Sequence, residues 1–132
     1  MHVQMVGTGS ILSDRISACA LVDGRLLLDT PNGSMKALRR LDVDPRSIDV
    51  CLITHFHADH FFDIVFLLLE AGLRQQRDEP LWLVGPAGFE DRVAALFDLS
   101  YPESWERFRA NAQVAFCELA SGETRINIPD FE

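Results

Sequence analysis

The segment from Thr54 to His60 constrains the fold more than any other part of the chain. It holds three of the four histidines, with an aspartate among them. An apolar, partly β-branched run at residues 48–53 leads into it, and a second apolar run at residues 61–69 leads out. These flanks predict a buried strand before the segment and a helix after it. The rest of the chain is therefore expected to be the scaffold of this strand–segment–helix unit.

Apolar periodicity and turn residues predict the remaining elements. Asp23-Gly24 lies between two apolar runs and predicts a hairpin, while Asp44-Pro45 is expected to close the first helix. Residues 101–111 stay ambiguous, and a short helix around Trp105 and Phe108 is one interpretation. Strands are expected at 2–6, 17–22, 25–29, 48–53, 81–84, 113–117 and 125–128, and helices at 35–41, 63–71 and 89–97. This order indicates an α/β layered domain with a mixed sheet and flanking helices.

Composition limits the classes of protein that this chain can be. The 132 residues are 48% hydrophobic, which favours a single domain with a buried core. The net charge of −8 argues against broad nucleic-acid binding, although a local site can still bind one phosphate group. Three cysteines without CxxC spacing predict free thiols in a reducing, cytoplasmic compartment. No signal peptide is predicted, and the apolar run at 61–69, interrupted by Asp63, is too short to span a membrane.

The chemistry of the histidine segment points to a metal site. Imidazole and carboxylate groups suit zinc, manganese or iron. In an extended or turning segment His55 and His57 can face the same side, and Asp59 with His60 would then face a second position. Two-metal hydrolases hold their ions about 3.5–4 Å apart. Three histidines and an aspartate in this spacing favour metal ligation over solvated or packed histidines, whereas the isolated His2 is expected to bind nothing.

A glycine-rich loop, Gly7-Thr8-Gly9-Ser10, follows the first predicted strand. Free backbone N–H groups in such a loop can bind a phosphate group. A simple strand-to-loop turn uses the same residues, and turn chemistry favours that second interpretation.

His55-x-His57-x-Asp59-His60 resembles the signature of the metallo-β-lactamase superfamily of binuclear metal hydrolases. Further matches resemble its ribonuclease Z-like branch, with arylsulfatase-like and phosphodiesterase relatives. The HxHxDH element is highly specific, and the glycine elements are informative only in their order. These further matches, within residues 3–98, are Gly7-Thr8-Gly9-Ser10, Arg15-x-Ser17, Leu27-Leu28-Asp29 with Gly33, Ile53-Thr54, and Gly85-Pro86-x-Gly88.

The resemblance implies roles for individual residues. His55 and His57 would bind the first metal ion, and Asp59 and His60 the second, with two zinc ions expected and manganese or iron as alternatives. Asp59 would also act in catalysis by orienting the metal-bound water. Asp29 would support the site from behind, although a turn aspartate is an equally good interpretation. The family completes its site with a later histidine, a bridging aspartate and a final histidine, and this chain has no histidine after His60.

The family fold is an αβ/βα sandwich of two similar halves, and residues 1–132 resemble little more than the first. We therefore expect a single partial domain, with two ligands for each ion and incomplete metal occupancy. Three accounts stay open: a fragment of a longer enzyme, which is favoured; a natural half that pairs with a partner or as a homodimer; or a degenerate relative. The sheet face that would pack on the second half is expected to be apolar and to promote self-association.

The implied activity is metal-assisted hydrolysis, with a phosphodiester as the favoured substrate and hydroxide as the nucleophile. The motif does not distinguish this bond from a sulfate ester, a lactone or a thioester. The acidic surface favours a small substrate over transfer RNA. The competing class is a non-catalytic metal-binding or assembly module.

Overall fold

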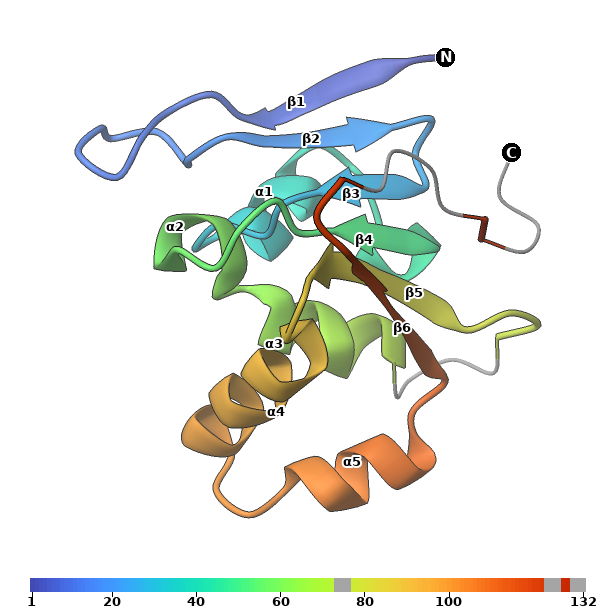
Figure 1. The fold of residues 1–132 in the computed structure, drawn as a ribbon. Helices are drawn as coiled ribbons and strands as arrows, with labels where there is room; N and C mark the ends of the chain where they lie inside the picture. The colour runs from blue at the N-terminus through green and yellow to red at the C-terminus, as the bar shows by residue number, and fades with distance from the viewer. Residues whose placement is uncertain (73–76, 123–126, 129–132) are drawn as a thin grey trace.

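The computed structural model describes residues 1–72, 77–122 and 127–128 (Figure 1). The strands are β1 Val3–Gly7, β2 Cys19–Val22, β3 Leu26–Leu28, β4 Val50–Leu52, β5 Leu81–Pro86 and β6 Val114–Leu119. The α-helices are α1 Ser34–Arg40, α2 Ala58–Phe61, α3 Ile64–Leu67, α4 Phe89–Ser100 and α5 Trp105–Asn111, with a 3₁₀ helix η1 Pro45–Ser47 and a π-helix η2 Leu68–Gly72. Within these described ranges, no helix is both long enough and apolar enough to cross a bilayer.

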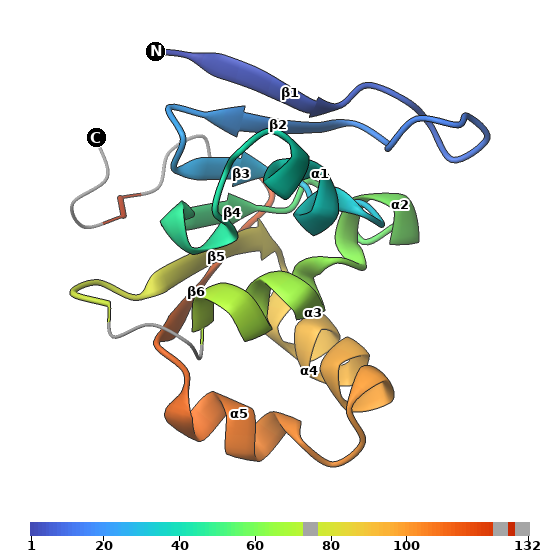
Figure 2. The same ribbon diagram turned by 180° about the vertical axis from the view of Figure 1, so that it is seen from behind.

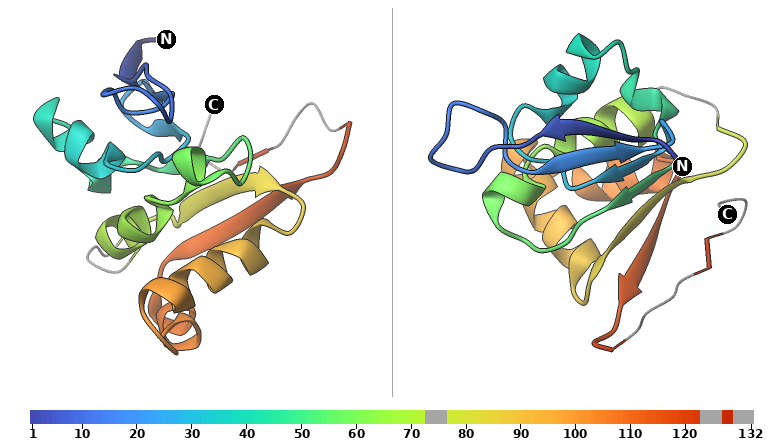
Figure 3. Two further views of the ribbon diagram at one scale, coloured as in Figure 1. Left: turned by 90° about the vertical axis from the view of Figure 1, so that its left-hand side faces the viewer. Right: turned by 90° about the horizontal axis from the view of Figure 1, so that it is seen from above.

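The six strands form one sheet whose spatial order follows the chain. β1, β2 and β3 pair antiparallel, whereas β3, β4, β5 and β6 pair parallel, which confirms the predicted mixed sheet. The predicted Asp23-Gly24 hairpin is confirmed, and both residues adopt the left-handed backbone that such a turn requires. The sheet twists strongly from β1 to β6 (Figure 3).

The helices pack against one face of the sheet, and Figure 2 shows α1 and α3 in front of the strands. The pleat sends alternate residues of each strand to this face, where they join the buried core. α1 contributes Met35 and Leu38, and α4 contributes Phe89 and Phe97. The strand residues on this face include Cys19, Leu21, Leu27, Cys51, Leu81, Leu83, Val114 and Phe116.

The second face of the sheet is also apolar, as the sequence predicts. Val3 and Met5 on this face are 49% and 53% exposed, whereas the more central Val50 and Val84 are buried. Its residues are Val3, Met5, Ala20, Val22, Leu26, Leu28, Val50, Leu52, Trp82, Val84, Pro86, Ala115, Cys117 and Leu119. The described part of the chain therefore has a core on one side of the sheet and a second apolar surface on the other.

Two predicted elements differ from the structure. The helix expected at 63–71 is confirmed as α3 and η2, which follow one another without a break, and its second half is π-helical. The short helix α2 precedes it, and Asp63 between α2 and α3 accepts hydrogen bonds from the Met35 N–H and the Ser34 hydroxyl at the start of α1. Asp44-Pro45 does not close α1. That helix ends at Arg40, and Asp44 instead caps η1 through the Arg46 N–H. The strand expected at 125–128 lies half outside the described residues, and residues 127–128 are not in a strand.

The remaining predicted elements are confirmed to within a few residues, and α5 resolves the ambiguous stretch in favour of a helix. The glycines of the Gly7-to-Ser10 loop are explained by close backbone packing. A Cβ atom on Gly7 would lie 2.8 Å from the Ile16 carbonyl oxygen and even closer to that of Ser17. The Gly9 N–H donates to the Ile16 carbonyl at 2.7 Å, so the loop uses this amide internally, in line with the turn interpretation.

Candidate metal centre

The histidine segment leaves the carboxyl end of β4, beside the carboxyl end of β3. Leu28 pairs with Leu52 in the parallel register, so the residues that follow the two strands emerge side by side. The Asp29 N–H donates to the Leu52 carbonyl at 2.8 Å and extends this pairing by one residue. Asp29 follows β3 and Thr54 follows β4 closely, which explains how residues distant in the sequence meet at one site.

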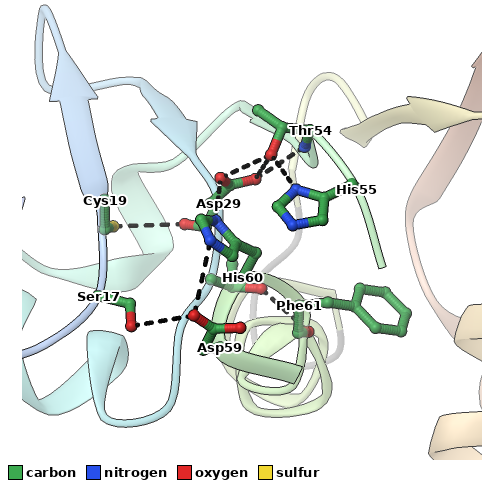
Figure 4. A network of polar contacts seen from close by, with 9 residues as sticks. Ser17, Cys19, Asp29, Thr54, His55, Asp59, His60 and Phe61 are labelled. Atoms are coloured by element: carbon green, nitrogen blue, oxygen red, sulfur yellow. Dashed lines mark hydrogen bonds and ion pairs between the residues drawn. The ribbon is translucent and has the colours of Figure 1, made fainter. Parts of the chain in front are cut away.

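Asp29 is the centre of a polar network that supports the histidines (Figure 4). Its side chain is 7% exposed. One carboxylate oxygen accepts from the Thr54 N–H at 2.7 Å, and the Thr54 hydroxyl lies 2.8 Å and 3.0 Å from the two oxygens. His60 Nδ1 lies 2.8 Å from Oδ2 of Asp29. The structure therefore brings Asp29 to the site, as the resemblance implies, and not to an ordinary turn.

The network also determines which nitrogen of each ring carries hydrogen. A carboxylate only accepts, so His60 Nδ1 donates to Asp29 and leaves the lone pair on Nε2. The Thr54 hydroxyl gives its one hydrogen to Asp29, so at its 3.0 Å contact with His55 Nδ1 the ring is the donor. In both imidazoles the lone pair of Nε2 is therefore available to bind a metal ion.

The four predicted ligands lie together. The ring centroid of His55 is 4.7 Å from that of His57 and 4.3 Å from that of His60. The Asp59 Oδ2 atom lies 3.7 Å from His60 Nε2 and accepts from the Ser17 hydroxyl at 3.4 Å. His2, by contrast, lies beside Asp23 at the start of β1 and outside this cluster.

The ligand atoms present are of the types that a divalent metal ion binds. Their number, however, is smaller than the number that such an ion ordinarily has. Imidazole Nε2 atoms held by a carboxylate network and an adjacent aspartate are the donors that zinc, manganese and iron accept. Within residues 1–72, 77–122 and 127–128, however, no group of three or more His, Cys, Asp or Glu side chains is arranged to hold one ion. The described residues therefore offer pairs of donors, and a catalytic zinc ordinarily has three protein ligands.

Two supporting residues were not predicted to have a role in the site. Thr54 links Asp29 to His55, and Ser17 links the loop before β2 to Asp59. Both residues belong to short stretches that match the family pattern, Ile53-Thr54 and Arg15-x-Ser17. Polar residues that flank a strand are a signal for such contacts, but the signal can be used only when the strand register is known.

Two buried cysteines lie beneath the site. Burial raises the pKa of the Cys19 thiol to about 12, with smaller contributions from the Asp29 and Asp63 carboxylates. Burial likewise raises the pKa of Cys51 well above its ordinary value. The Cys19 thiol donates to the Asp29 carbonyl oxygen at 3.3 Å, which the neutral form alone can do. Both thiols are free, as predicted, and both stay protonated in the folded chain at neutral pH.

This pKa shift predicts a loss of stability in alkali. Above pH about 8.5 the thiol ionises in the unfolded chain but not in the folded one, so the unfolded state binds fewer protons and stability falls as pH rises. Cys19 alone should contribute a slope of about 1.4 kcal/mol per pH unit between pH about 9 and 12. Urea unfolding of wild type and Cys19→Ala over this range measures the difference in slope. Equal slopes of unfolding free energy against pH in the two proteins would contradict the raised pKa of Cys19. The cavity left by alanine lowers stability equally at every pH, so it does not affect this comparison.

Comparisons with known proteins agree with this geometry. A sequence model of the family described as Anti-Pycsar protein Apyc1 matches residues 1–88. Ribonuclease Z from Thermococcus sibiricus is 31% identical over 137 residues, covering 100% of this chain and 42% of the relative. Ribonuclease Z from Alkaliphilus oremlandii is 39% identical over 72 residues, covering 54% of this chain and 22% of the relative. The chain thus spans less than half the length of these curated relatives.

Two solved structures share the fold. The short form of human tRNase Z superposes with a TM-score of 0.66 and 30% sequence identity, covering 78% of this chain and 42% of that chain. The metallo-beta-lactamase fold protein YhfI from Bacillus subtilis superposes with a TM-score of 0.60 and 16% identity, covering 92% of this chain and 46% of that chain.

Proposed function

Because the chain belongs to the metallo-β-lactamase superfamily, in its ribonuclease Z-like branch and the Anti-Pycsar protein Apyc1 family, we propose that it supplies half of the metal centre of a phosphodiester hydrolase. His55 and His57 would hold one divalent ion, and Asp59 with His60 would hold a second. Asp59 would also orient the nucleophile. The ions, when bound, would activate water and offset the charge that develops on the phosphoryl group.

The observation that carries this proposal is the Asp29 network. One buried carboxylate directs the lone pairs of two neighbouring imidazoles outward, His60 directly and His55 through Thr54. Such an arrangement raises the basicity of a metal-bound histidine and restricts its orientation. A cluster of merely packed histidines would not need a buried carboxylate behind it, because neutral imidazoles can bond to water at this partly exposed position.

The donors that are missing from the described residues must come from elsewhere in an active enzyme. A longer chain, a partner protein or a second copy of this chain could supply them. The apolar second face of the sheet supports an additional layer of protein there, since burial of such a face stabilises an assembly. Residues 1–132 would then be one partial domain of a complete site, working in the reducing cytoplasm that three free cysteines favour.

A non-catalytic metal-binding or assembly module is the second candidate. It is favoured by one observation, the lack of any three-donor group among the described side chains. A sulfate ester, lactone or thioester could also replace the phosphodiester, since the donor set does not select the bond. The acidic net charge of −8 favours a small substrate over a long polynucleotide.

Replacing His57 with alanine should lower zinc binding at least about tenfold, because one of two donors to an ion is lost. Equilibrium dialysis against micromolar zinc, with the bound metal quantified by mass spectrometry, measures the effect. Hydrolysis of bis(p-nitrophenyl) phosphate by the zinc- and manganese-loaded chain is measured in parallel. His2→Ala is the matched control, and it should retain wild-type metal content.

The outcomes separate the candidates. Unchanged zinc content in His57→Ala would count against the ligand assignment. Zinc binding without ester hydrolysis, in this chain and in any longer form that carries the missing ligands, would favour the non-catalytic module. Hydrolysis that His57→Ala abolishes and His2→Ala does not would support the enzyme.

A further inference from the structure

A hollow of about 540 Å³ lies where three helical elements meet, η2, α4 and α5. Leu69 of η2, Phe97 of α4 and Phe108 of α5 line it, together with the loop from α4 to α5. Figure 2 shows this loop at the bottom of the molecule, with α5 below α3. The volume is within the range of small-molecule sites, about 300–1,000 Å³. None of the four predicted metal ligands lines this α4–α5 hollow, so it is separate from the candidate metal centre.

The backbone of η2 is unusual at this position. η2 is a π-helix, and π-helical turns are rare and occur frequently at functional sites. Gly72, its last residue, lies so close to α5 that an added Cβ would be 3.2 Å from Phe108 Cζ. The π-helix is therefore in direct contact with α5, and Leu69 lines the α4–α5 hollow at this junction.

The apolar part of the lining is largely aromatic. The ring centroid of Phe97 lies 4.5 Å from that of Phe108 and 5.7 Å from that of Tyr101, and such separations are typical of interacting aromatic pairs. Phe97 and Phe108 are buried, whereas Tyr101 is 40% exposed, so the ring cluster reaches the surface at Tyr101. A planar aromatic group is thus the apolar body that the α4–α5 hollow favours.

The charge of the lining indicates the polar part of a ligand. Arg107 is the only charged side chain among the described residues that line the α4–α5 hollow. Within the described part of the chain no carboxylate pairs with its guanidinium, whereas Arg109 pairs with Glu90 at 2.9 Å. Glu103 and Glu106 are close to Arg107 in the sequence, but neither lines the hollow. Because a guanidinium binds a carboxylate through two parallel hydrogen bonds, Arg107 favours a ligand that carries a carboxylate.

We propose that the α4–α5 hollow binds a small aromatic carboxylate, with its ring against Phe97, Tyr101 and Phe108 and its carboxylate at Arg107. One cation balances the single charge of a carboxylate. A dianionic phosphate would bring excess negative charge to a chain whose net charge is already −8. This site goes beyond the proposed function and does not depend on it, because no predicted metal ligand takes part.

The test compares ligands that share a ring and differ in charge. Methyl resonances of the leucines are recorded while the metal-free chain, kept in chelator, is titrated with phenylacetate, phenylacetamide or phenethylamine. We expect phenylacetate to shift the Leu69 signal and to bind about tenfold more tightly than phenylacetamide, because hydrogen bonds between charged groups are stronger than those with a neutral partner. Phenethylamine, which is a cation, should bind most weakly. Leu12, which is 95% exposed and does not line the hollow, is the internal control.

Arg107→Met keeps an unbranched side chain but removes the charge, and it should make the affinities for phenylacetate and phenylacetamide equal. Arg40→Met is the matched control, because Arg40 is also exposed on a helix and does not line the hollow. It should retain the preference of about tenfold. Hexanoate, a carboxylate without a ring, should bind wild type more weakly than phenylacetate does.

Equal affinities of wild type for the three ring probes, or an unchanged preference in Arg107→Met, would overturn the proposal. Hexanoate binding as tightly as phenylacetate would overturn its aromatic part. Shifts at Leu69 that grow with protein concentration alone would also overturn it, because a second copy would then occupy the hollow. A chain that binds phenylacetate as expected but binds no metal would refute the proposed function and leave this site intact.

Discussion

Asp29→Asn should lower the zinc affinity of this chain about ten- to 100-fold and destabilise the fold by about 2–3 kcal/mol. The amide cannot accept from Thr54 and His60 together as the carboxylate does, so at least one partly buried donor loses its partner. His60 then loses the contact that places its lone pair on Nε2. The backbone of Asp29 has a left-handed φ of 61°, which asparagine tolerates, so this variant isolates the effect of the side chain.

Zinc affinity is measured by competition with a chromophoric chelator, and stability by urea unfolding of the metal-free chain. Asp63→Asn is the matched control. Asp63 is also a buried carboxylate that accepts from a backbone N–H and a hydroxyl, but these groups belong to Met35 and Ser34 and not to a histidine. It should lose stability to a similar degree and keep wild-type zinc affinity. Equal zinc affinities in Asp29→Asn and wild type would show that Asp29 does not position the ligands.

Gly7→Ala should destabilise the chain by about 3 kcal/mol or more, since a methyl group there would overlap the carbonyl groups of Ile16 and Ser17. The backbone at Gly7 cannot move away from these carbonyl groups without breaking the pairing of Gly7 with Cys19. The movement would also displace Ser17 from its contact with Asp59. Denaturant unfolding followed by circular dichroism measures the loss.

Gly24→Ala is the comparison that separates lack of space from backbone strain. Gly24 has a φ of 71°, so alanine is strained there, but no other atom lies within 4 Å of the added methyl. Its cost should be about 1–2 kcal/mol. If Gly7→Ala proves as stable as Gly24→Ala, the close approach of the two segments is not maintained in solution.

Local signals in the sequence were sufficient for much of the fold. Asp23-Gly24 between two apolar runs predicts the observed hairpin, because turn chemistry depends on adjacent residues. The spacing of the histidines likewise predicts their cluster, since four residues within one short segment cannot lie far apart. The long-range contacts were not accessible in this way. Asp63, at the first position of the helix predicted at 63–71, bonds to the start of α1, about thirty positions earlier in the chain, and no local pattern indicates this contact.

The candidate site shows the same limit. His55, His57, Asp59 and His60 follow from one motif, but the link from His55 through Thr54 to Asp29 depends on the parallel register of β3 and β4. Apolar patterning predicts that β3 and β4 are buried, but it does not predict that they are neighbours in the sheet. Asp29 could therefore be identified as a supporting residue or as a turn residue, and only the three-dimensional arrangement decides between them.

The apolar second face has a consequence for strand alignment. In an ordinary two-layer domain, sliding one strand by a single residue would bury its polar side chains, and the pattern itself forbids the slip. Here alternate residues are apolar on both faces, so hydrophobicity alone hardly distinguishes one alignment from the next. Alignment must then depend on a few specific contacts, among them the Asp23-Gly24 turn and the bonds from Asp29 to Leu52 and Thr54. The carboxylate that orients the histidines thus also helps to keep β3 and β4 in register.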